Sequence, residues 1–210
     1  VGAGVSLLEA FQVLANYTPR ADATPAGDAD YWHYLIESWK QRDRVARIAD
    51  PAQWPVDFDE HLDAAHAMNL FRRIDPRLAQ VLPEDSDEIG GGPERIGSGT
   101  SGFVVADVDG NMIAITQTLS TWGGSFYVSR GLGFLYNNHL RSNRTAPGAY
   151  GQLKPLTRSN TANVPMIVFK ERGGALTPRL AVASAGNAWI PASTYSIVTG
   201  GIDGDMSMQQ

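Results

Sequence analysis

The spacing of apolar residues changes near the middle of the chain, and this change limits the fold more than any other feature. Apolar residues recur at helical spacing in 5–17, 28–51 and 59–75. Residues 83–99, PEDSDEIGGGPERIGSG, are polar and rich in glycine, as in a linker. The segments after the linker are short and β-branched or aromatic, which predicts strands at 102–108, 112–119, 125–129, 133–138, 165–170 and 180–185, before a helix over 189–201. This order predicts an α+β fold with helices packed on a mostly antiparallel sheet.

We predict one structural domain with two parts. Residues 1–99 form a mostly helical part that ends in the glycine-rich linker, and residues 100–210 form a strand-rich part. The chain begins at Val1 and closes on GGIDGDMSMQQ, which is typical of a glycine-rich turn followed by an Asp-capped helix that has just begun. We therefore expect a fragment of a longer chain, and we interpret Asp203–Asp205 as a helix cap instead of a cation site.

Composition excludes several function classes. Hydrophobic residues make up 43% and charged residues 19% of the 210 residues, which is typical of an ordered globular protein. The net charge is -5 and the 17 Lys and Arg are scattered, so we expect no nucleic-acid partner. The absence of cysteine excludes thiol nucleophiles and Cys-based metal sites but leaves the compartment open. No apolar run approaches the ~20 residues of a membrane span, and no cofactor is expected.

Two other sequence patterns give no site. His61 and His66 are five residues apart instead of the four of a helical metal pair, so we expect surface histidines and no metal site. Ser184 in VASAG resembles a nucleophile elbow, but Val182 takes the place of the first glycine and no His follows in the chain.

A kinase-like glycine spacing is present at Gly97-x-Gly99-x-x-Gly102-x-Val104. A kinase would need a Lys on the next strand, where this chain has Thr116. A dinucleotide fold would need a strand before the glycines and a helix after them, and the order here is a linker and then a strand. We therefore predict that neither nucleotide site is present.

The glycines before Thr100 have a second interpretation, which concerns Thr100 itself. A flexible linker that runs into a strand beginning with Thr is what a self-cleaving N-terminal-nucleophile hydrolase requires. Scission before Thr100 would free an α-amine, which can act as the base for an otherwise weak hydroxyl nucleophile. The competing interpretation is an ordinary linker threonine.

The hairpin loop supports the first interpretation. Residues 107–111, DVDGN, suit a three-residue loop with a type I turn and a left-handed glycine. In that register Thr100 lies directly opposite Thr118, with Ser120 and Thr116 on the same face. A two-residue loop would shift the register and break this arrangement.

Two stretches of the second half, TSGFVVADVDGNMIAITQTLSTWGGS and GLGFLYNN, resemble the small subunit of the γ-glutamyltranspeptidase family. Upstream, Asp43-Arg44 and Asp50-Pro51 are similar to the D-R-x5-D-P run of the family's large subunit. The resemblance thus implies that residues 1–99 are the C-terminal part of the large-subunit region and residues 100–210 the N-terminal part of the small-subunit region. KPL at 154–156 and VASAGNAWI at 182–190 lie where the family has R-P-L-S-S and G-S-P-G-G-S-R-I. The resemblance spans essentially the whole chain and implies the αββα four-layer sandwich of the Ntn hydrolases, incomplete in this fragment.

The resemblance also implies site residues. Thr100 becomes the nucleophile, with self-cleavage after Gly99, and Thr118 becomes the residue that supports it. Gly186 and Asn187 fall on the pair whose backbone N–H groups form the oxyanion hole. A strand, a turn and a helix start would leave such N–H groups free for an oxyanion.

The departures from the family concern substrate recognition. The acidic residues that follow N-N in the family, and that hold the substrate ammonium, are replaced here by His139-Leu140-Arg141-Ser142. Ser120 takes the place of the Asn in the family's T-x-N, and Thr157 that of the first Ser in R-P-L-S-S. The resemblance thus implies Ser120, His139, Ser142 and Thr157 as substrate-binding residues. Arg141 and Arg158 either face inward, where they would oppose an ammonium, or face water. Gly102 stands where the resemblance predicts His.

The resulting prediction is a self-processing N-terminal-threonine amidohydrolase or acyltransferase that resembles γ-glutamyltranspeptidase, also called glutathione hydrolase. Its partners would be a small-molecule amide and the two subunits of one precursor, with a substrate-carboxylate Arg in the upstream part. Two alternatives stay open: an inactive member that acts as a binding protein, and a branch with cephalosporin-acylase-like or oxamate-amidohydrolase-like specificity. Family members are often periplasmic or secreted, and this sequence gives no compartment.

Overall fold

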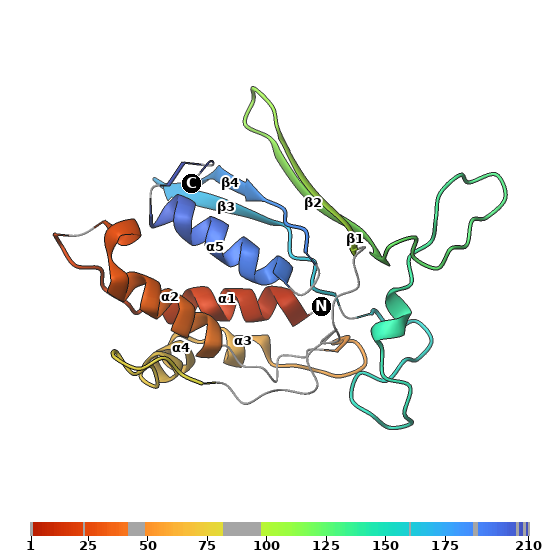
Figure 1. The fold of residues 1–210 in the computed structure, drawn as a ribbon, viewed down its shortest axis with the longest axis horizontal. Helices are drawn as coiled ribbons and strands as arrows, with labels where there is room; N and C mark the ends of the chain where they lie inside the picture. The colour runs from red at the N-terminus through yellow and green to blue at the C-terminus, as the bar shows by residue number, and fades with distance from the viewer. Residues whose placement is uncertain are drawn as a thin grey trace.

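The helices and strands follow the predicted order of helices, then strands, then a final helix (Figure 1). The computed structural model describes residues 2–22, 24–41, 49–81, 98–159, 161–186, 189–204, 206–207 and 209. Its α-helices are α1 (Gly2–Leu14), α2 (Ala29–Gln41), α3 (Phe58–His61), α4 (Ala64–Phe71) and α5 (Ile190–Ile202), and its short 3-10 turns are η1 (Pro25–Gly27) and η2 (His139–Ser142). Its strands are β1 (Ser98–Ala106), β2 (Met112–Thr121), β3 (Met166–Arg172) and β4 (Ala175–Val182). Most of the predicted linker lies outside the described residues.

The strands form two antiparallel hairpins in place of one larger sheet. β1 pairs with β2, and β3 pairs with β4, each as a separate two-stranded sheet. α5 contacts both α1 and β4, whereas the tip of the β1–β2 hairpin stands apart from the helices (Figure 1). The described residues are therefore mixed α and β, with small antiparallel sheets, as the sequence predicts at that level.

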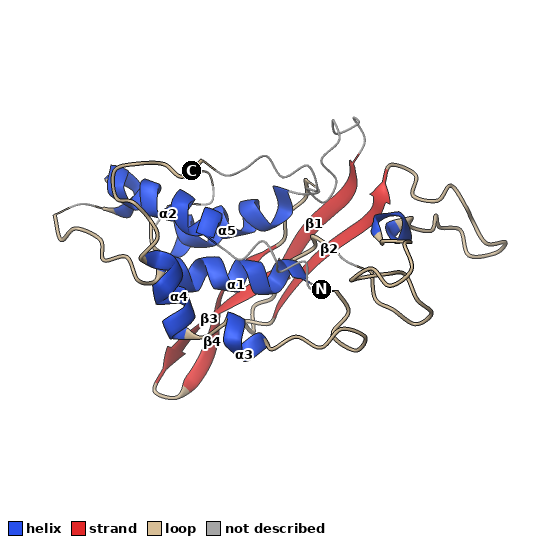
Figure 2. Cartoon of the chain, turned by 90° about the horizontal axis from the view of Figure 1, so that it is seen from below, coloured by secondary structure: helices blue, strands red, loops and turns tan. Residues whose placement is uncertain are grey.

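The strands predicted over 125–129 and 133–138 are wrong. Only the isolated bridge between Val128 and Leu135 forms there. Phe126 has a φ of 56°, and Gly131 and Gly133 have φ values of 84° and 68°, so the backbone turns instead of extending. The result is a long loop that extends away from the helices (Figures 1 and 2).

The predicted turn near the last residues is also wrong. α5 continues to Ile202 through both glycines of TGG, and Asp203 follows its last turn. The Asp203 carboxylate accepts a hydrogen bond of 3.1 Å from the Tyr31 hydroxyl on α2. Burial raises the pKa of Asp203. Asp203 thus ties α5 to α2, while Asp205 lies outside the described residues.

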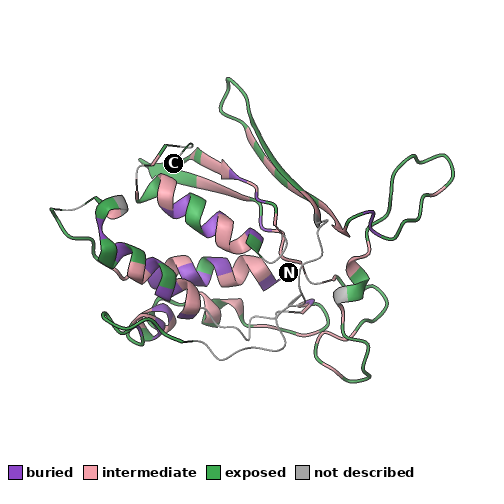
Figure 3. Ribbon diagram, in the orientation of Figure 1, coloured by how far each residue is buried: buried purple, intermediate pink, exposed green. Residues whose placement is uncertain are grey.

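The core lies among the helices. The larger cluster of buried side chains contains Leu7, Ala10 and Leu14 of α1, Tyr31 and Leu35 of α2, Val164, and Ile190 and Tyr195 of α5. A second cluster joins α1 to α4 through Val13, Ala67, Leu70 and Ile74. The Tyr195 ring lies between the rings of Phe11 and Trp39, with centroids 5.0 and 5.3 Å away. Figure 3 shows burial concentrated in these helices, and the β1–β2 hairpin largely exposed. In the part of the chain that the structure describes, every helix is too short or too polar to cross a bilayer.

Candidate active site

The β1–β2 hairpin has the predicted loop and register. The backbone N–H of Asp107 donates to the Asn111 carbonyl at 3.1 Å, and the Gly110 N–H donates back to the Asp107 carbonyl at 3.2 Å. Gly110 has a φ of 86°, which a side chain would rarely adopt. The Asp107 carboxylate accepts from the side chain and backbone of Asn111, and these bonds lower its pKa. This three-residue loop fixes the register that places Thr100 opposite Thr118.

The two threonines contact each other through their hydroxyls. Thr100 Oγ1 donates to Thr118 Oγ1 at 2.9 Å. The same Thr118 oxygen accepts the backbone N–H of Ser120 at 2.9 Å. Because the Ser120 N–H is fixed by the backbone, it holds Thr118 in one orientation, and Thr118 in turn orients the Thr100 hydroxyl. The structure thus brings three of the predicted site residues together.

Ser120 takes part through its backbone, which the sequence did not predict. The register between β1 and β2 shifts between Ser98 and Thr100, so β2 has an extra residue at this point. Ser120 has a φ of 76°, an unusual backbone for a residue with a side chain, at a cost of about 1–2 kcal/mol. The expected alternation of hydroxyls along one face therefore ends at Thr118. Bulges and strained residues of this kind are common beside active sites.

Gly102 lies where β1 crosses the chain that leaves β4. A Cβ added to Gly102 would lie 2.7 Å from the Ala183 carbonyl carbon and oxygen and 2.9 Å from the Ser184 nitrogen. These contacts are too close for any side chain without a backbone shift. Gly102 therefore sets the close approach between the strand of Thr100 and the segment that leads to Gly186.

The predicted strand, turn and helix start are present at Gly186. β4 ends at Val182, Gly186 has a φ of 123°, and the Trp189 N–H donates to the Gly186 carbonyl at 3.1 Å before α5 begins. Ser184 is buried, with its hydroxyl 3.2 Å from that of Thr194 on α5. Ser184 thus anchors the turn and does not face solvent as a nucleophile would. Asn187 lies outside the described residues.

Asn138 is a positioning residue that sequence reasoning missed. Its side-chain amide donates to Thr121 Oγ1 at 2.7 Å and accepts from the Thr121 N–H at 3.3 Å. Its own N–H donates to the Leu119 carbonyl at 3.1 Å. These three bonds fasten the segment before η2 to the end of β2. The feature of the sequence that could have indicated this role is the pair of Asn residues in LYNN.

η2 carries two of the predicted substrate-binding residues. His139 and Ser142 are its first and last residues, and the Asn138 contacts place η2 next to the end of β2 that holds Thr118. His139 is half-buried, and this burial lowers its pKa. A neutral imidazole is therefore favoured at this position near pH 7. Arg141 is exposed.

Asp50 holds Arg158, the residue that follows Thr157. The Arg158 N–H donates to Asp50 Oδ2 at 2.9 Å, and its guanidinium lies 3.6 Å from Oδ1. The Arg158 side chain is 73% exposed, so it faces water beside Asp50, as one of the two predicted alternatives required. The backbone bond from Arg158 and a second from Ala52 lower the pKa of the buried Asp50. The Thr157 hydroxyl is buried without a hydrogen-bond partner among the described residues.

His61 and His66, which were expected on the surface, lie in the helical part of the molecule, in α3 and α4. His61 and His66 are only partly exposed and lie beside the buried Glu9 of α1. The expected surface positions therefore hold only in part, because the turn between α3 and α4 packs both rings against α1.

Comparison with known proteins agrees with the resemblance. A family model described as γ-glutamyltranspeptidase matches residues 1–210. A glutathione hydrolase proenzyme of Pseudomonas sp. (strain A14) is 27% identical over 99% of this chain and 36% of its own length. An acylase ACY 1 proenzyme of Pseudomonas sp. (strain V22) is 29% identical over 99% of this chain and 35% of its own length. The chain thus spans about a third of these relatives.

A solved structure was also matched, a γ-glutamyltranspeptidase from Pseudomonas nitroreducens complexed with L-DON. It is 26% identical, with 51% of this chain and 58% of that chain covered at a TM-score of 0.44. The family model extends over every residue of the sequence. The chain therefore belongs to the γ-glutamyltranspeptidase family, whose curated relatives include hydrolases that are made as proenzymes.

Proposed function

We propose that the whole protein is a self-processing amidohydrolase or acyltransferase with Thr100 as its nucleophile. The observation that carries the proposal is the 2.9 Å hydrogen bond between the hydroxyls of Thr100 and Thr118, with Thr118 held by the Ser120 N–H. A threonine hydroxyl oriented by a second hydroxyl, directly after a glycine, is the arrangement that a self-cleaving nucleophile needs. Membership of a family with proenzyme relatives supports it.

Self-cleavage follows from the position of Thr100. Its Oγ1 attacks the carbonyl carbon of Gly99, the peptide C–N bond breaks, and the acyl group moves from nitrogen to oxygen. Water then hydrolyses the resulting ester, which releases a carboxylate on Gly99 and a free α-amine on Thr100. The bulge in β2 opposite Gly99 supports this step, because it interrupts regular pairing at the scissile bond.

Turnover uses the same oxygen. The freed α-amine takes the proton from Thr100 Oγ1 as the oxygen attacks the substrate amide, and the leaving amine departs with a proton. The acyl-enzyme ester is then released by water or by an acceptor amine. We assign the oxyanion contacts to the N–H groups of Gly186 and Asn187, because the start of a helix is where backbone N–H groups lack partners within the helix. The close packing of Gly102 on Ala183–Ser184 would hold these donors near β1.

For the whole protein we propose the four-layer αββα sandwich. Consecutive apolar residues of β1, Phe103, Val104 and Val105, are all exposed in the described structure. Such a surface is favourable only when another layer covers it. We propose that further chain of the whole protein packs on this hairpin.

We further propose that the acyl group differs from unmodified γ-glutamyl. Near the end of β2, η2 presents a half-buried His139 whose neutral form burial favours, in place of an acidic side chain. A neutral imidazole does not neutralise a substrate ammonium, so an acyl group without that ammonium fits better. The relatives include an acylase ACY 1 proenzyme. This relative favours acylase-like specificity as the second candidate function.

The test is turnover by the whole protein of γ-glutamyl-p-nitroanilide, a glutaryl amide and an oxamate-type amide. Thr100→Ala should lower turnover at least about a thousandfold, because no other group replaces a nucleophile. Thr100→Ser should keep measurable activity. A Thr100→Ala protein that retains wild-type turnover would exclude the assignment, and a preference for the γ-glutamyl compound would exclude the proposed shift in specificity. A wild-type protein inactive on all three amides would favour the binding-protein alternative.

A further inference from the structure

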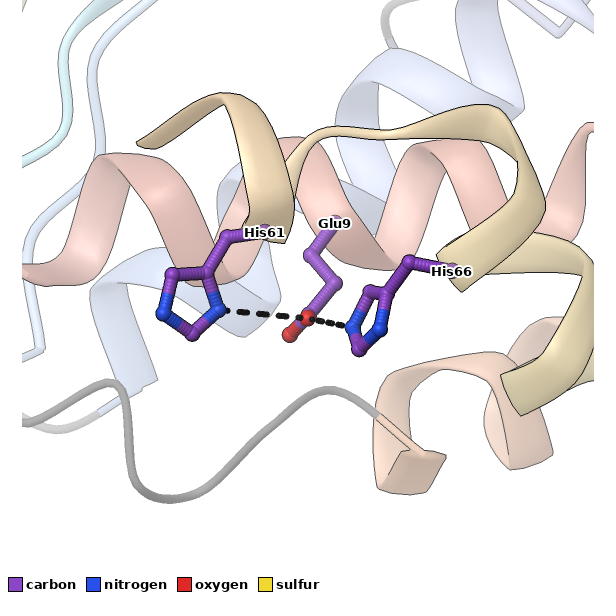
Figure 4. Close-up of side chains that lie close together, drawn as sticks. All are labelled: Glu9, His61 and His66. Carbon is purple, nitrogen blue, oxygen red and sulfur yellow. Dashed lines mark hydrogen bonds and ion pairs between the residues drawn. The ribbon is translucent and has the colours of Figure 1, made fainter. Parts of the chain in front are cut away.

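Glu9, His61 and His66 converge from three helices at a place remote in sequence from the candidate active site (Figure 4). His66 Nε2 lies 2.9 Å from Glu9 Oε1, and His61 Nδ1 lies 4.0 Å from the same oxygen. One ligand atom from each residue lies within 4.8 Å of the other two. Figure 4 shows the two rings on either side of the Glu9 carboxylate.

Helix caps and one long-range bond hold the two histidines in place. The Asp57 carboxylate caps α3 by accepting from the N–H groups of Asp59 and Glu60. The Asp63 carboxylate caps α4 by accepting the His66 N–H at 3.0 Å. Between the helices, the Leu62 carbonyl accepts from Gln12 Nε2 at 2.8 Å, one turn after Glu9 on α1. These contacts hold the backbone of both histidines beside α1.

The separations suit a small divalent ion. Zinc bonds to imidazole nitrogen and carboxylate oxygen of about 2.0–2.1 Å imply neighbouring ligand atoms about 3.3 Å apart in a tetrahedron. The two distances to Glu9 Oε1, 2.9 and 4.0 Å, lie on either side of that value. Both separations differ from the tetrahedral value by less than about one ångström. Small side-chain movements would therefore bring each separation to that value.

Burial and chemistry favour a metal over solvent at this position. The Glu9 side chain is 1% exposed, and buried charged groups in proteins are either paired or bound to metals. The histidine side chains are 22% and 31% exposed, so an ion can enter from water. Two imidazoles and one carboxylate are a donor set for zinc and similar transition metals, while calcium and magnesium prefer oxygen alone.

We propose that Glu9, His61 and His66 form a binding site for one divalent transition-metal ion, with Zn²⁺ as the best fit. The ion would join α1 to the α3–α4 turn, and a water molecule would complete its coordination. Because the three residues belong to the helical half, this site stands independently of the chemistry proposed for Thr100. Without a metal, the contact between His66 and Glu9 would be an ordinary ion pair or hydrogen bond.

The test is metal binding by the whole protein after removal of metals with a chelator. Titration with Co²⁺, read by its visible absorption, and with Zn²⁺, read by calorimetry, should each show one equivalent bound. His61→Ala and His66→Ala should each weaken binding at least about tenfold and reduce the rise in Tm that Zn²⁺ gives. His33→Ala is the matched control, because His33 lies on α2 with its ring against the Asp75 carbonyl, and it should bind like wild type.

The outcomes separate the two interpretations of the cluster. Stoichiometric Zn²⁺ binding that either histidine variant weakens, but His33→Ala does not, would establish the site. No stoichiometric binding by wild type would overturn the proposal and leave the ion pair. Equal binding by wild type and both variants would also overturn it, since the ion would then lie elsewhere. The histidine variants are used in place of a Glu9 substitution because Glu9 is buried in the fold, with a side chain only 1% exposed.

Discussion

The helical block of α1, α2, α4 and α5 and the β1–β2 hairpin are held together in different ways. The block buries aliphatic and aromatic side chains from both halves of the sequence in two clusters. The hairpin exposes apolar side chains and is fixed by a few specific contacts, at Thr100–Thr118, Gly102–Ala183 and Asn138–Thr121. Stability and the proposed chemistry therefore reside in different parts of the molecule, so substitutions in each part should have different signatures.

The largest effect is expected from Tyr195→Ala in the helical block. Tyr195 is 1% exposed and packs between two aromatic rings, so its loss should lower the free energy of unfolding by about 3–5 kcal/mol. Tyr127→Ala is the matched control in the loop after β2, where Tyr127 is 62% exposed, and it should cost less than about 1 kcal/mol. Urea unfolding measures both. Equal losses would mean that the whole protein covers the loop and that the contrast between the regions does not hold.

Gly102→Ala tests the junction between the regions. Its Cβ would meet the Ala183 backbone, so the variant should lose about 1–3 kcal/mol and part of the activity as β1 moves away from the turn at Gly186. Gly4→Ala in α1 has open space around the new Cβ and should be neutral or stabilising by up to about 1 kcal/mol. Thermal unfolding and turnover check both. A Gly102→Ala protein with unchanged stability would contradict the close approach.

Thr118→Val tests the hairpin site itself. It keeps the side-chain shape but removes the oxygen that contacts Thr100 and the Ser120 N–H, so kcat should fall about ten- to a hundredfold, or roughly 1.4–2.8 kcal/mol. Thr116→Val makes the same change two residues away, where the hydroxyl is buried without a hydrogen-bond partner among the described residues. That control should leave kcat unchanged. Equal losses from both substitutions would point to general damage to β2.

The smallest effect concerns the pH dependence of stability at Asp50. Its folded pKa is lowered, so its contribution is complete above its unfolded pKa of about 3.9 and is lost as pH falls through the folded value. Asp50→Asn should therefore lower the urea midpoint at pH 7, and the difference from wild type should shrink towards pH 3. Asp22→Asn is the exposed control, since Asp22 also has a lowered pKa through Arg20 but lies in solvent. A difference for Asp50→Asn that does not change with pH would contradict the assignment.

The features that were predicted correctly from the sequence depend on residues close to one another in the chain. The DVDGN loop fixed the pairing of Thr100 with Thr118, residues only 18 positions apart. The helical periodicity likewise located the block that carries the core. Gly102 lacked a reason in the sequence, because its partner Ala183 lies just after β4, far away in the chain, and only folding brings the two together.

The remaining misses have the same origin. Glu9 and His66 are 57 positions apart, so a search for His residues at helical spacing could not find their cluster. The positive φ of Ser120 depends on the bulge between two strands, which no propensity of serine indicates. Asn138 lies in a plain Asn pair, and its role depends on the path of the loop between it and Thr121.

The most direct test of the central claim is the intact mass of the whole protein under denaturing conditions. Self-cleavage before Thr100 predicts two chains, the second of which begins at Thr100, and a single uncut chain for Thr100→Ala. A single chain for the wild type, or a cut elsewhere that persists in Thr100→Ala, would contradict the assignment of Thr100 as the nucleophile.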